Sequence, residues 1–152
     1  MSKTFKVEVV TPEATALSTE ASSLQVRAWE GYLGIMANHA PLLAVLLPGV
    51  LTLRDEAGRP SFYALRGGFM EVANNRAVIL ADAIEKAEEV SVEAAKKAYE
   101  ESLAAPAPAA APPGATAETR QKLRDLALEE QQAKRDWAEA RLKAVEHARE
   151  GK

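Results

Sequence analysis

His39 is one of two histidines in the chain and the residue type best suited to proton transfer in its first half. Imidazole titrates near neutral pH, so this side chain could act as a general base. No serine or cysteine nucleophile motif surrounds it, however. A structural histidine in a loop, or a contact with another protein, is therefore the better interpretation of His39.

The other candidates for chemistry are two carboxylates and two glycines. Glu71 and Asp82 could pair as acid and base, but each stands beside apolar neighbours in a predicted strand, which is typical of hydrogen-bonded edge carboxylates. Gly31 and Gly34 could begin a phosphate loop, but no Lys-Ser/Thr follows and no helical pattern opens there. With no cysteine, a thiolate metal site and a disulfide are excluded. We expect no catalytic, metal or cofactor-binding residues.

Length and charge limit the classes that remain. A chain of 152 residues has room for one core-bearing domain and an appendage. A formal net charge of −3 argues against a nucleic-acid partner, which would favour a basic surface. No signal-peptide pattern and no apolar run of about 18 residues is present. We therefore expect a cytoplasmic protein that meets a membrane only through other proteins.

The elements that must position these side chains are short strands in the first part of the chain. Apolar and polar residues alternate at 5–9 and 24–28, and the series continues at 50–53, 62–65, 69–72 and 77–81. Gly67-Gly68 and Asn74-Asn75 punctuate them as turn residues. The pattern predicts an antiparallel β-sandwich over residues 1–85.

Two helices are predicted after the strands. Ser91 can cap the first, which ends near residue 104, so that 86–104 form a connection and a short helix. Residues 105–116 are rich in proline and alanine and predict an extended linker. Thr116 can cap a long helix over 117–152, which would contain neither proline nor glycine through Glu150.

The long helix combines a thin apolar stripe with many charges. The stripe consists of Leu123, Leu126, Ala133, Trp137, Ala140, Ala144 and Ala148. At about 1.5 Å per residue this helix would reach about 50 Å, against about 20 Å for the first, so the first cannot cover it. An extended linker could add about 30 Å of reach. We infer a further docking site for this helix on another protein.

Three segments of the predicted sandwich carry a family resemblance. The first is Glu30-Gly31-Tyr32-Leu33-Gly34-Ile35-Met36-Ala37-Asn38-His39-Ala40-Pro41-Leu42-Leu43, followed by Pro48-Gly49. The other two follow in the expected order and are Gly67-Gly68-Phe69-Met70-Glu71-Val72 and Val78-Ile79-Leu80-Ala81-Asp82-Ala83. Together these segments resemble epsilon subunits of bacterial F-type ATP synthases.

The resemblance implies a non-catalytic subunit of the central stalk, held peripherally at the cytoplasmic face of the bacterial membrane. In that family the sandwich binds the gamma subunit and the c-ring, and the C-terminal helices either fold on the sandwich or extend to the alpha/beta catalytic head and block ATP hydrolysis. Carried over, Glu30, Tyr32, His39 and Leu42 would contact gamma or the c-ring. For Tyr32 a core position is an equal alternative.

For the long helix, the resemblance suggests that Lys134, Arg135, Arg141 and Lys143 meet acidic loops of the catalytic head. The alternative is a solvated helix with internal ion pairs, since acidic residues balance the basic ones. Docking through exposed charges would weaken with salt.

Two features depart from the family pattern. The Pro/Ala-rich insert is longer than the family's short turn, which argues against a compact helical hairpin. Some bacterial epsilons bind ATP through an Ile/Leu-Asp-x-x-Arg-Ala motif, whose Asp and Arg positions are Ser91 and Ala94 here. ATP sensing of that kind is therefore not expected.

Two other functions remain open. One is a stand-alone β-sandwich module that binds a ligand and carries a helical oligomerisation tail, which would need a polar pocket with clustered titratable groups. The other is an epsilon subunit that is structural only and has no braking role.

Overall fold

A computed structural model describes residues 3–104 and 110–151 of the chain. Its strands are β1 (Phe5–Val10), β2 (Thr15–Ala21), β3 (Ser23–Ala28), β4 (Gly31–Met36), β5 (Leu42–Leu46), β6 (Gly49–Arg54), β7 (Pro60–Leu65), β8 (Gly68–Ala73), β9 (Arg76–Ala81) and β10 (Ile84–Lys86). The helices are the 3-10 turn η1 (Ala87–Glu89), α1 (Val92–Ser102) and α2 (Ala117–Glu150).

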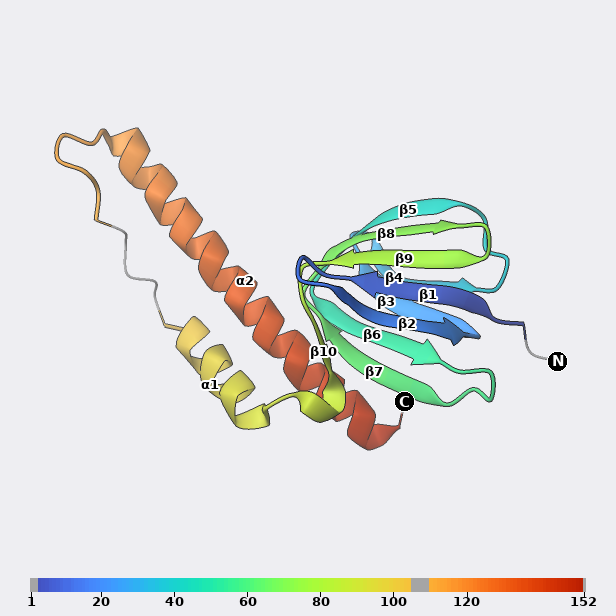
Figure 1. Ribbon diagram of the computed structural model, residues 1–152. Coiled ribbons are helices and arrows are strands. Elements are labelled where there is room, and N and C mark those ends of the chain that lie inside the picture. The colour runs from blue at the N-terminus through green and yellow to red at the C-terminus, as the bar shows by residue number, and fades with distance from the viewer. Residues whose placement is uncertain (1–2, 105–109, 152) are drawn as a thin grey trace.

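The strands form two layers joined through β3 and β5. The hydrogen-bonded order is β10-β7-β6-β3-β5-β8-β9-β1-β2, and β4 pairs with β3 outside this path. β3 and β5 share only the register pair Ala28 and Leu46, so the sheet passes from one layer to the other at this point. One layer contains β5, β8, β9, β1 and β2, and the other contains β3, β4, β6, β7 and β10 (Figure 1). The predicted β-sandwich followed by two helices is thus confirmed, although β1 and β9 pair in parallel.

The core between the layers is aliphatic. Its largest fully buried side chains include Leu24, Ile35, Leu51, Met70 and Ile79, which alternate with outward-facing residues along their strands. Burial of such side chains contributes about 1.5–3 kcal/mol each relative to exposure. The sandwich is therefore a rigid support for whatever its outer faces carry.

Gly68 allows β8 to approach β9 closely. Its φ of +138° lies in a region that L side chains rarely adopt, and a Cβ at this position would meet the Leu80 carbonyl oxygen at 1.9 Å. A larger residue here would require one of the two strands to shift.

Both helices begin at the predicted caps. The Ser91 hydroxyl accepts a hydrogen bond from the amide of Ala94, and the Thr116 hydroxyl accepts one from Thr119. Over the described part of the chain, no helix has the length and apolarity required to cross a membrane. The predicted linker 105–116 falls partly on residues 105–109, which lie outside the described residues.

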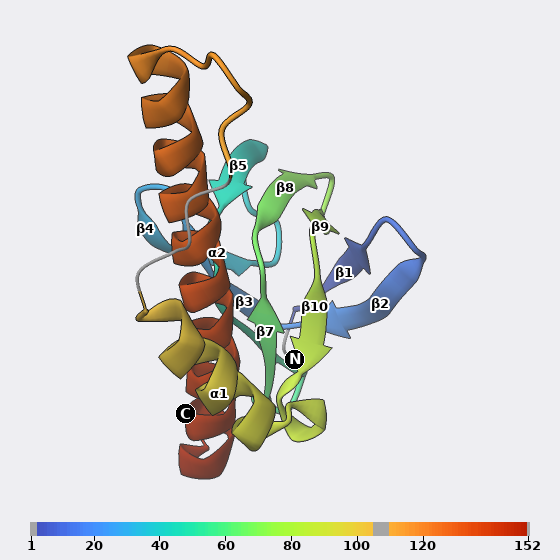
Figure 2. The ribbon, with the colours of Figure 1, turned by 90° about the vertical axis from the view of Figure 1, so that its left-hand side faces the viewer.

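The C-terminal half of α2 packs on the outer face of β6 and β7. Ala144 joins Val50, Phe62, Ala64 and Ala87 in a second apolar cluster, with Trp137 and Ala148 packed against it. α1 packs side by side with the same half of α2, from Gln131 beside Ser102 to Arg149 beside Val92 (Figures 1 and 2). The long insert does not prevent a helical hairpin, because this half of α2 presents one side to α1 and another to the sandwich.

Candidate functional site

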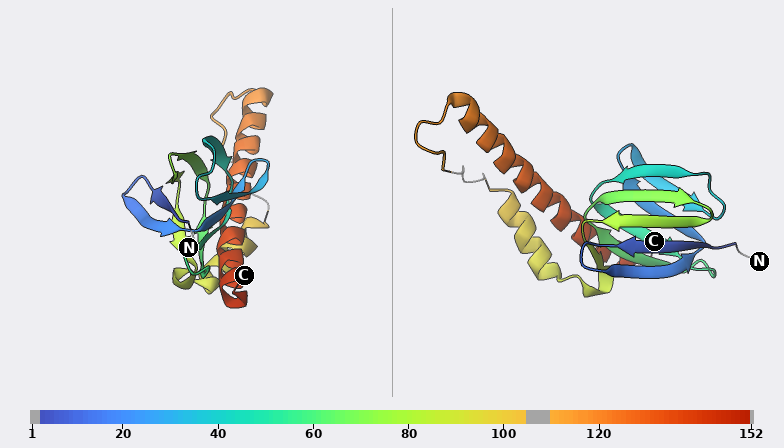
Figure 3. Two further views of the ribbon diagram at one scale, coloured as in Figure 1. Left: turned by 90° about the vertical axis from the view of Figure 1, so that its right-hand side faces the viewer. Right: turned by 45° about the horizontal axis from the view of Figure 1, so that its top comes forward.

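An exposed apolar surface lies on the layer opposite to the strands on which α2 packs. Leu43, Val45, Phe69 and Leu80 are 72%, 47%, 53% and 55% exposed, respectively. Val45 pairs with Phe69, and Phe69 pairs with Leu80, so these side chains stand on one face of β5, β8 and β9. We call these four residues the outer apolar face. β8, β9, β1 and β2 lie on the far side of the sandwich from α2 (Figures 2 and 3).

A groove of about 460 Å³ borders the outer apolar face. It lies between the β3–β4 turn and β5, and Trp29, Glu30, Tyr32 and Leu42 are among its lining residues. Trp29 is 74% exposed and Tyr32 is 55% exposed, so Tyr32 is not a core residue. Three of the four residues predicted to contact gamma or the c-ring are thus brought together around one groove.

His39, the fourth, lies outside the residues that line this groove. It belongs to the loop between β4 and β5, where its Nδ1 is 2.7 Å from the Ala40 carbonyl oxygen. The loop is tied to the β8–β9 turn because the Asn38 amide donates to the Asn75 side-chain oxygen at 2.7 Å. Asn75 also donates to the Thr4 carbonyl oxygen. The sequence singled out His39 but not the Asn75 contact that holds its loop.

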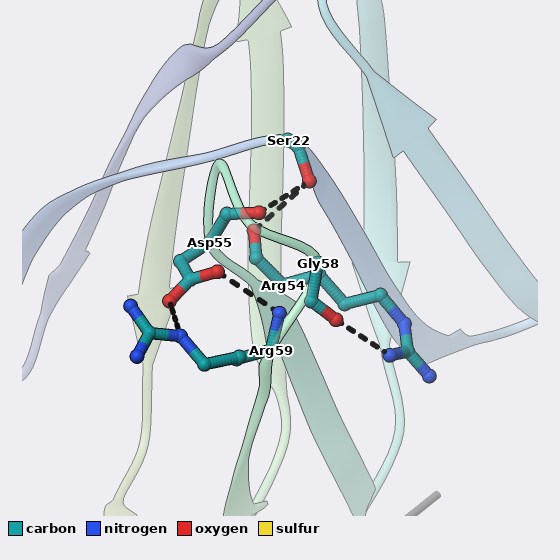
Figure 4. A network of polar contacts seen from close by, with 5 residues as sticks. All are labelled: Ser22, Arg54, Asp55, Gly58 and Arg59. Atoms are coloured by element: carbon teal, nitrogen blue, oxygen red, sulfur yellow. Dashed lines mark hydrogen bonds and ion pairs between the residues drawn. The ribbon is translucent and has the colours of Figure 1, made fainter. Parts of the chain in front are cut away.

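The β6–β7 turn is braced against the start of β3 (Figure 4). The Ser22 hydroxyl donates to the carbonyl oxygens of Arg54 and Asp55, and the Arg54 guanidinium donates to the Gly58 carbonyl oxygen. The Arg59 amide and guanidinium both donate to the Asp55 carboxylate, at 2.9 and 3.0 Å. The hydrogen bond from the Arg59 backbone amide is the main cause that lowers the pKa of Asp55. This turn steadies the two strands on which α2 docks.

A second carboxylate with a lowered pKa lies beside the outer apolar face. Glu8 on β1 accepts a hydrogen bond from Arg76 and pairs with Lys6 at 3.3 Å. The hydrogen bond from Arg76 is the largest cause that lowers the pKa of Glu8, followed by the one from Lys6. Since Glu8 and Val78 are register partners on β1 and β9, this charged cluster lies at the rim of the apolar surface.

The four basic residues singled out on α2 have different surroundings. The Arg141 guanidinium lies 3.2 Å from the Glu85 carboxylate on β10 and 5.8 Å from the centre of the Trp137 ring. Arg135 donates to the Ser102 carbonyl oxygen at the end of α1. Lys143 pairs with Glu139 at 3.0 Å, and Lys134 lines a hollow of about 220 Å³ between the helices. In this arrangement Arg135 and Arg141 therefore hold α2 against its own chain.

Sequence reasoning missed several residues of these surfaces. Trp29, Phe69 and Leu80 are large apolar side chains at outward positions, and Glu85 and Gln131 join α2 to β10 and α1, respectively. A usable signal existed for the apolar surface. Residues 69–70 and 78–81 are apolar at successive positions, which indicates a strand covered on both faces.

The hollows found among the described residues are open to solvent rather than enclosed. One of them, about 670 Å³, lies between the sandwich and the end of α2 and is lined by Arg54, Lys143, Glu146 and His147 among others. Within residues 3–104 and 110–151, no group of three or more His, Asp or Glu residues is arranged to hold a metal ion. The exposed surfaces, rather than a pocket, are the features that require an explanation.

Comparison with known proteins identifies the family to which the sandwich belongs. The model of the ATP synthase delta/epsilon chain β-sandwich domain matches residues 4–87. The ATP synthase epsilon chain of Anaeromyxobacter sp. (strain K) is 41% identical over 95 residues, covering 62% of this chain and 71% of the relative. That of Pelotomaculum thermopropionicum is 42% identical over 105 residues, covering 67% and 78%.

Two solved structures share the fold. One is a chain of the Euglena gracilis mitochondrial ATP synthase OSCP/F1/c-ring structure, with a TM-score of 0.63, 23% identity, and coverage of 86% of this chain and 78% of that chain. The other belongs to the central stalk and c-ring of the Tetrahymena thermophila enzyme, with a TM-score of 0.50, 19% identity and coverage of 88% and 98%. At these identities the likeness concerns the fold. Since the family model matches more than half of the sequence, the chain belongs to the ATP synthase delta/epsilon family, and its curated relatives are epsilon chains.

Proposed function

We propose that this chain works in the central stalk of a bacterial ATP synthase, at the cytoplasmic face of the membrane. Its sandwich binds the gamma subunit and the c-ring and so couples rotation to ATP synthesis. Its α2 helix inhibits ATP hydrolysis when it leaves the sandwich and reaches the catalytic head. The role is mechanical and regulatory, without a catalytic residue in this chain.

The outer apolar face is the observation that carries the proposal for the sandwich. Four large apolar side chains, 47–72% exposed, stand together on β5, β8 and β9. Clustered exposed apolar side chains on a folded domain mark protein-binding surfaces, because their burial in a complex removes apolar area from water. The adjoining groove adds Trp29 and Tyr32, and aromatic residues are enriched at the centres of interfaces. We assign this combined surface to gamma and the c-ring.

A matched pair of substitutions tests this assignment. Leu80 on β9 and Leu126 on α2 are each 55% exposed, so Leu80→Ser and Leu126→Ser remove the same side chain at the same exposure. We expect Leu80→Ser to weaken binding to purified gamma by about 2 kcal/mol, as at an interface hot spot, and Leu126→Ser to leave it unchanged. Titration by calorimetry measures both. Equal affinities for wild type and Leu80→Ser would rule out this face as the gamma surface.

The braking part of the proposal rests on α2. Its docked half is held by a small apolar cluster and by charged contacts, whereas Leu126 and Leu128 nearer its start are 55% and 56% exposed. A helix with one modest docking face can exchange between two partners when the two states differ by a few kcal/mol. Lys134 and Lys143 are exposed in the docked state and are the first candidates for contact with acidic loops of the head.

Charge removal tests the contact with the head. Lys134→Gln and Lys143→Gln together should relieve inhibition of ATP hydrolysis in the assembled enzyme. In the docked chain they cost only an exposed pair with Glu139, worth about 0.3–0.5 kcal/mol. Lys97→Gln on α1, which removes another exposed i,i+4 pair, is the control. Unchanged inhibition in the double variant at low salt would reject these lysines as head contacts.

A further inference from the structure

The C-terminal end of α1 is closed by backbone hydrogen bonds from Leu103 to the Glu100 carbonyl oxygen and from Ala104 to that of Glu101. The last carbonyl groups of a helix have no partner within it, and a glycine in the left-handed conformation often supplies the closing turn. Here the C-cap is Leu103 in the right-handed helical conformation, and the last turn contains no basic residue. At 11 residues α1 is also shorter than the length at which an isolated helix is stable in water.

α2 supplies further donors to this end of α1. The Gln131 side-chain amide lies 3.1, 2.8 and 2.8 Å from the carbonyl oxygens of Glu101, Ser102 and Ala104, so its two N–H groups are shared among three acceptors. Arg135 donates from Nη2 to the Ser102 carbonyl oxygen at 2.6 Å. Its positive charge also lies at the negative end of the α1 dipole.

Ser102 is buried at the centre of this contact. The residue is 2% exposed, and its hydroxyl donates to the Tyr99 carbonyl oxygen while lying 3.4 Å from Arg135 Nε. A carbonyl group at a buried helix end costs stability if it loses its donor without gaining water. Gln131 and Arg135 therefore supply donors from α2 to the carbonyl oxygens of Ser102 and Ala104 at this end of α1.

We propose that Gln131 and Arg135 form a latch that closes the helical hairpin, and that the last turn of α1 is helical only while α2 is in place. When α2 leaves, the carbonyl groups of Ser102 and Ala104 lose the donors that Gln131 and Arg135 supply, and the turn unwinds. The unwound residues then lengthen the tether of α2, because extended chain spans about 3.3 Å per residue against about 1.5 Å in a helix. The role of the latch in regulating the brake rests on the proposed function. The existence of the latch in the free chain does not depend on it.

Amide hydrogen exchange on the free, full-length chain tests the latch. In the variant Gln131→Ala/Arg135→Ala, amides at the end of α1 should exchange at least about tenfold faster than in wild type, which corresponds to about 1.4 kcal/mol. Amides of β3 and β9 should be unaffected, which verifies that the sandwich is folded.

The chain offers matched controls on the same helix. Gln132 donates to Asp136 and Arg124 donates to Gln121, both within α2. Gln132→Ala/Arg124→Ala therefore makes the same chemical changes without touching α1, and exchange in α1 should stay at the wild-type rate. Equal rates at the end of α1 in both double variants would overturn the latch.

The assembled ATP synthase separates the latch from the brake. If both proposals hold, Gln131→Ala/Arg135→Ala increases the released population and strengthens inhibition of ATP hydrolysis at low salt, unless the head contact uses Arg135 itself. Gln131→Ala alone avoids that overlap and should still strengthen inhibition. Faster amide exchange in α1 with an unchanged rate of ATP hydrolysis would support the latch and contradict the brake. Unchanged amide exchange in α1 would contradict the latch, whatever the rate of ATP hydrolysis.

Discussion

Replacing Arg141 by methionine is expected to loosen α2 from the sandwich. The arginine side chain is 18% exposed and that of its partner Glu85 is 25% exposed, so most of the pair is shielded from water. Nη2 donates to one oxygen of Glu85 at 3.3 Å. Nε lies 3.2 Å from the other oxygen but makes no hydrogen bond, so that contact is a charge pair only. Methionine keeps an unbranched apolar stem at this position without the charge.

The size of the effect follows from these contacts. One hydrogen bond between charged groups contributes about 1.5–3 kcal/mol, and the contact with the Trp137 ring adds about 0.5–1 kcal/mol. Because both side chains remain partly exposed, we expect the two contributions together to lie near the lower end of their combined range, at about 2–3 kcal/mol. Such a change shifts the docked-to-released ratio about thirty- to hundredfold, since about 1.4 kcal/mol corresponds to tenfold.

Hydrogen exchange of α2 amides between Trp137 and Ala148 measures that shift. Lys122→Met is the control, because Lys122 pairs with Glu118 at 3.4 Å with side chains 72% and 80% exposed. Its loss should cost no more than about 0.5 kcal/mol. A double-mutant cycle with Glu85→Gln should give a coupling of at least about 1 kcal/mol. Equal, small effects of Arg141→Met and Lys122→Met, or a coupling near zero, would refute the reasoning.

Two further predictions concern the sandwich. Gly68→Ala should destabilise it by more than about 3 kcal/mol in urea unfolding, because the new Cβ overlaps the Leu80 carbonyl and strains the backbone; Gly34→Ala, where a Cβ meets nothing within 4 Å, is the control, and an equal midpoint for both would contradict the account. Because Arg59 lowers the pKa of Asp55 in the folded state, the Asp55 contribution is present at neutral pH and is lost as pH falls through the folded pKa. Asp55→Asn should therefore reduce stability at pH 7 and flatten its decline in acid, and urea midpoints with the wild-type pH dependence would argue against this turn as a source of stability.

The sequence predicted those elements of the fold in which one face is buried and the other is exposed to water. β1 and β3 show that alternation and were found from it. β2 lies at a sheet edge and is largely exposed, so it lacks the alternation. β5 is apolar at every position because it covers the core with one face and presents the outer apolar face with the other. Local pattern cannot distinguish such a strand from other apolar runs.

The candidate surfaces were predicted in part. The family segment led to Glu30, Tyr32 and Leu42, which the fold gathers around one groove. Cap residues were also predictable, because they act within four residues of their partners. Contacts such as Arg141 with Glu85 and Gln131 with Ser102 join residues 56 and 29 positions apart. They depend on how α2 crosses α1 and the sandwich, which no local pattern encodes.

Reversible locking of α2 tests the central claim most directly. The chain has no cysteine, so Glu85→Cys/Arg141→Cys introduces its only two thiols, at the docking contact, where a short cleavable linker can join them in the assembled ATP synthase. We predict rapid, uninhibited ATP hydrolysis while the linker holds α2 on the sandwich, and inhibition after the linker is cleaved. The same hydrolysis rate before and after cleavage would contradict a brake built on the release of α2.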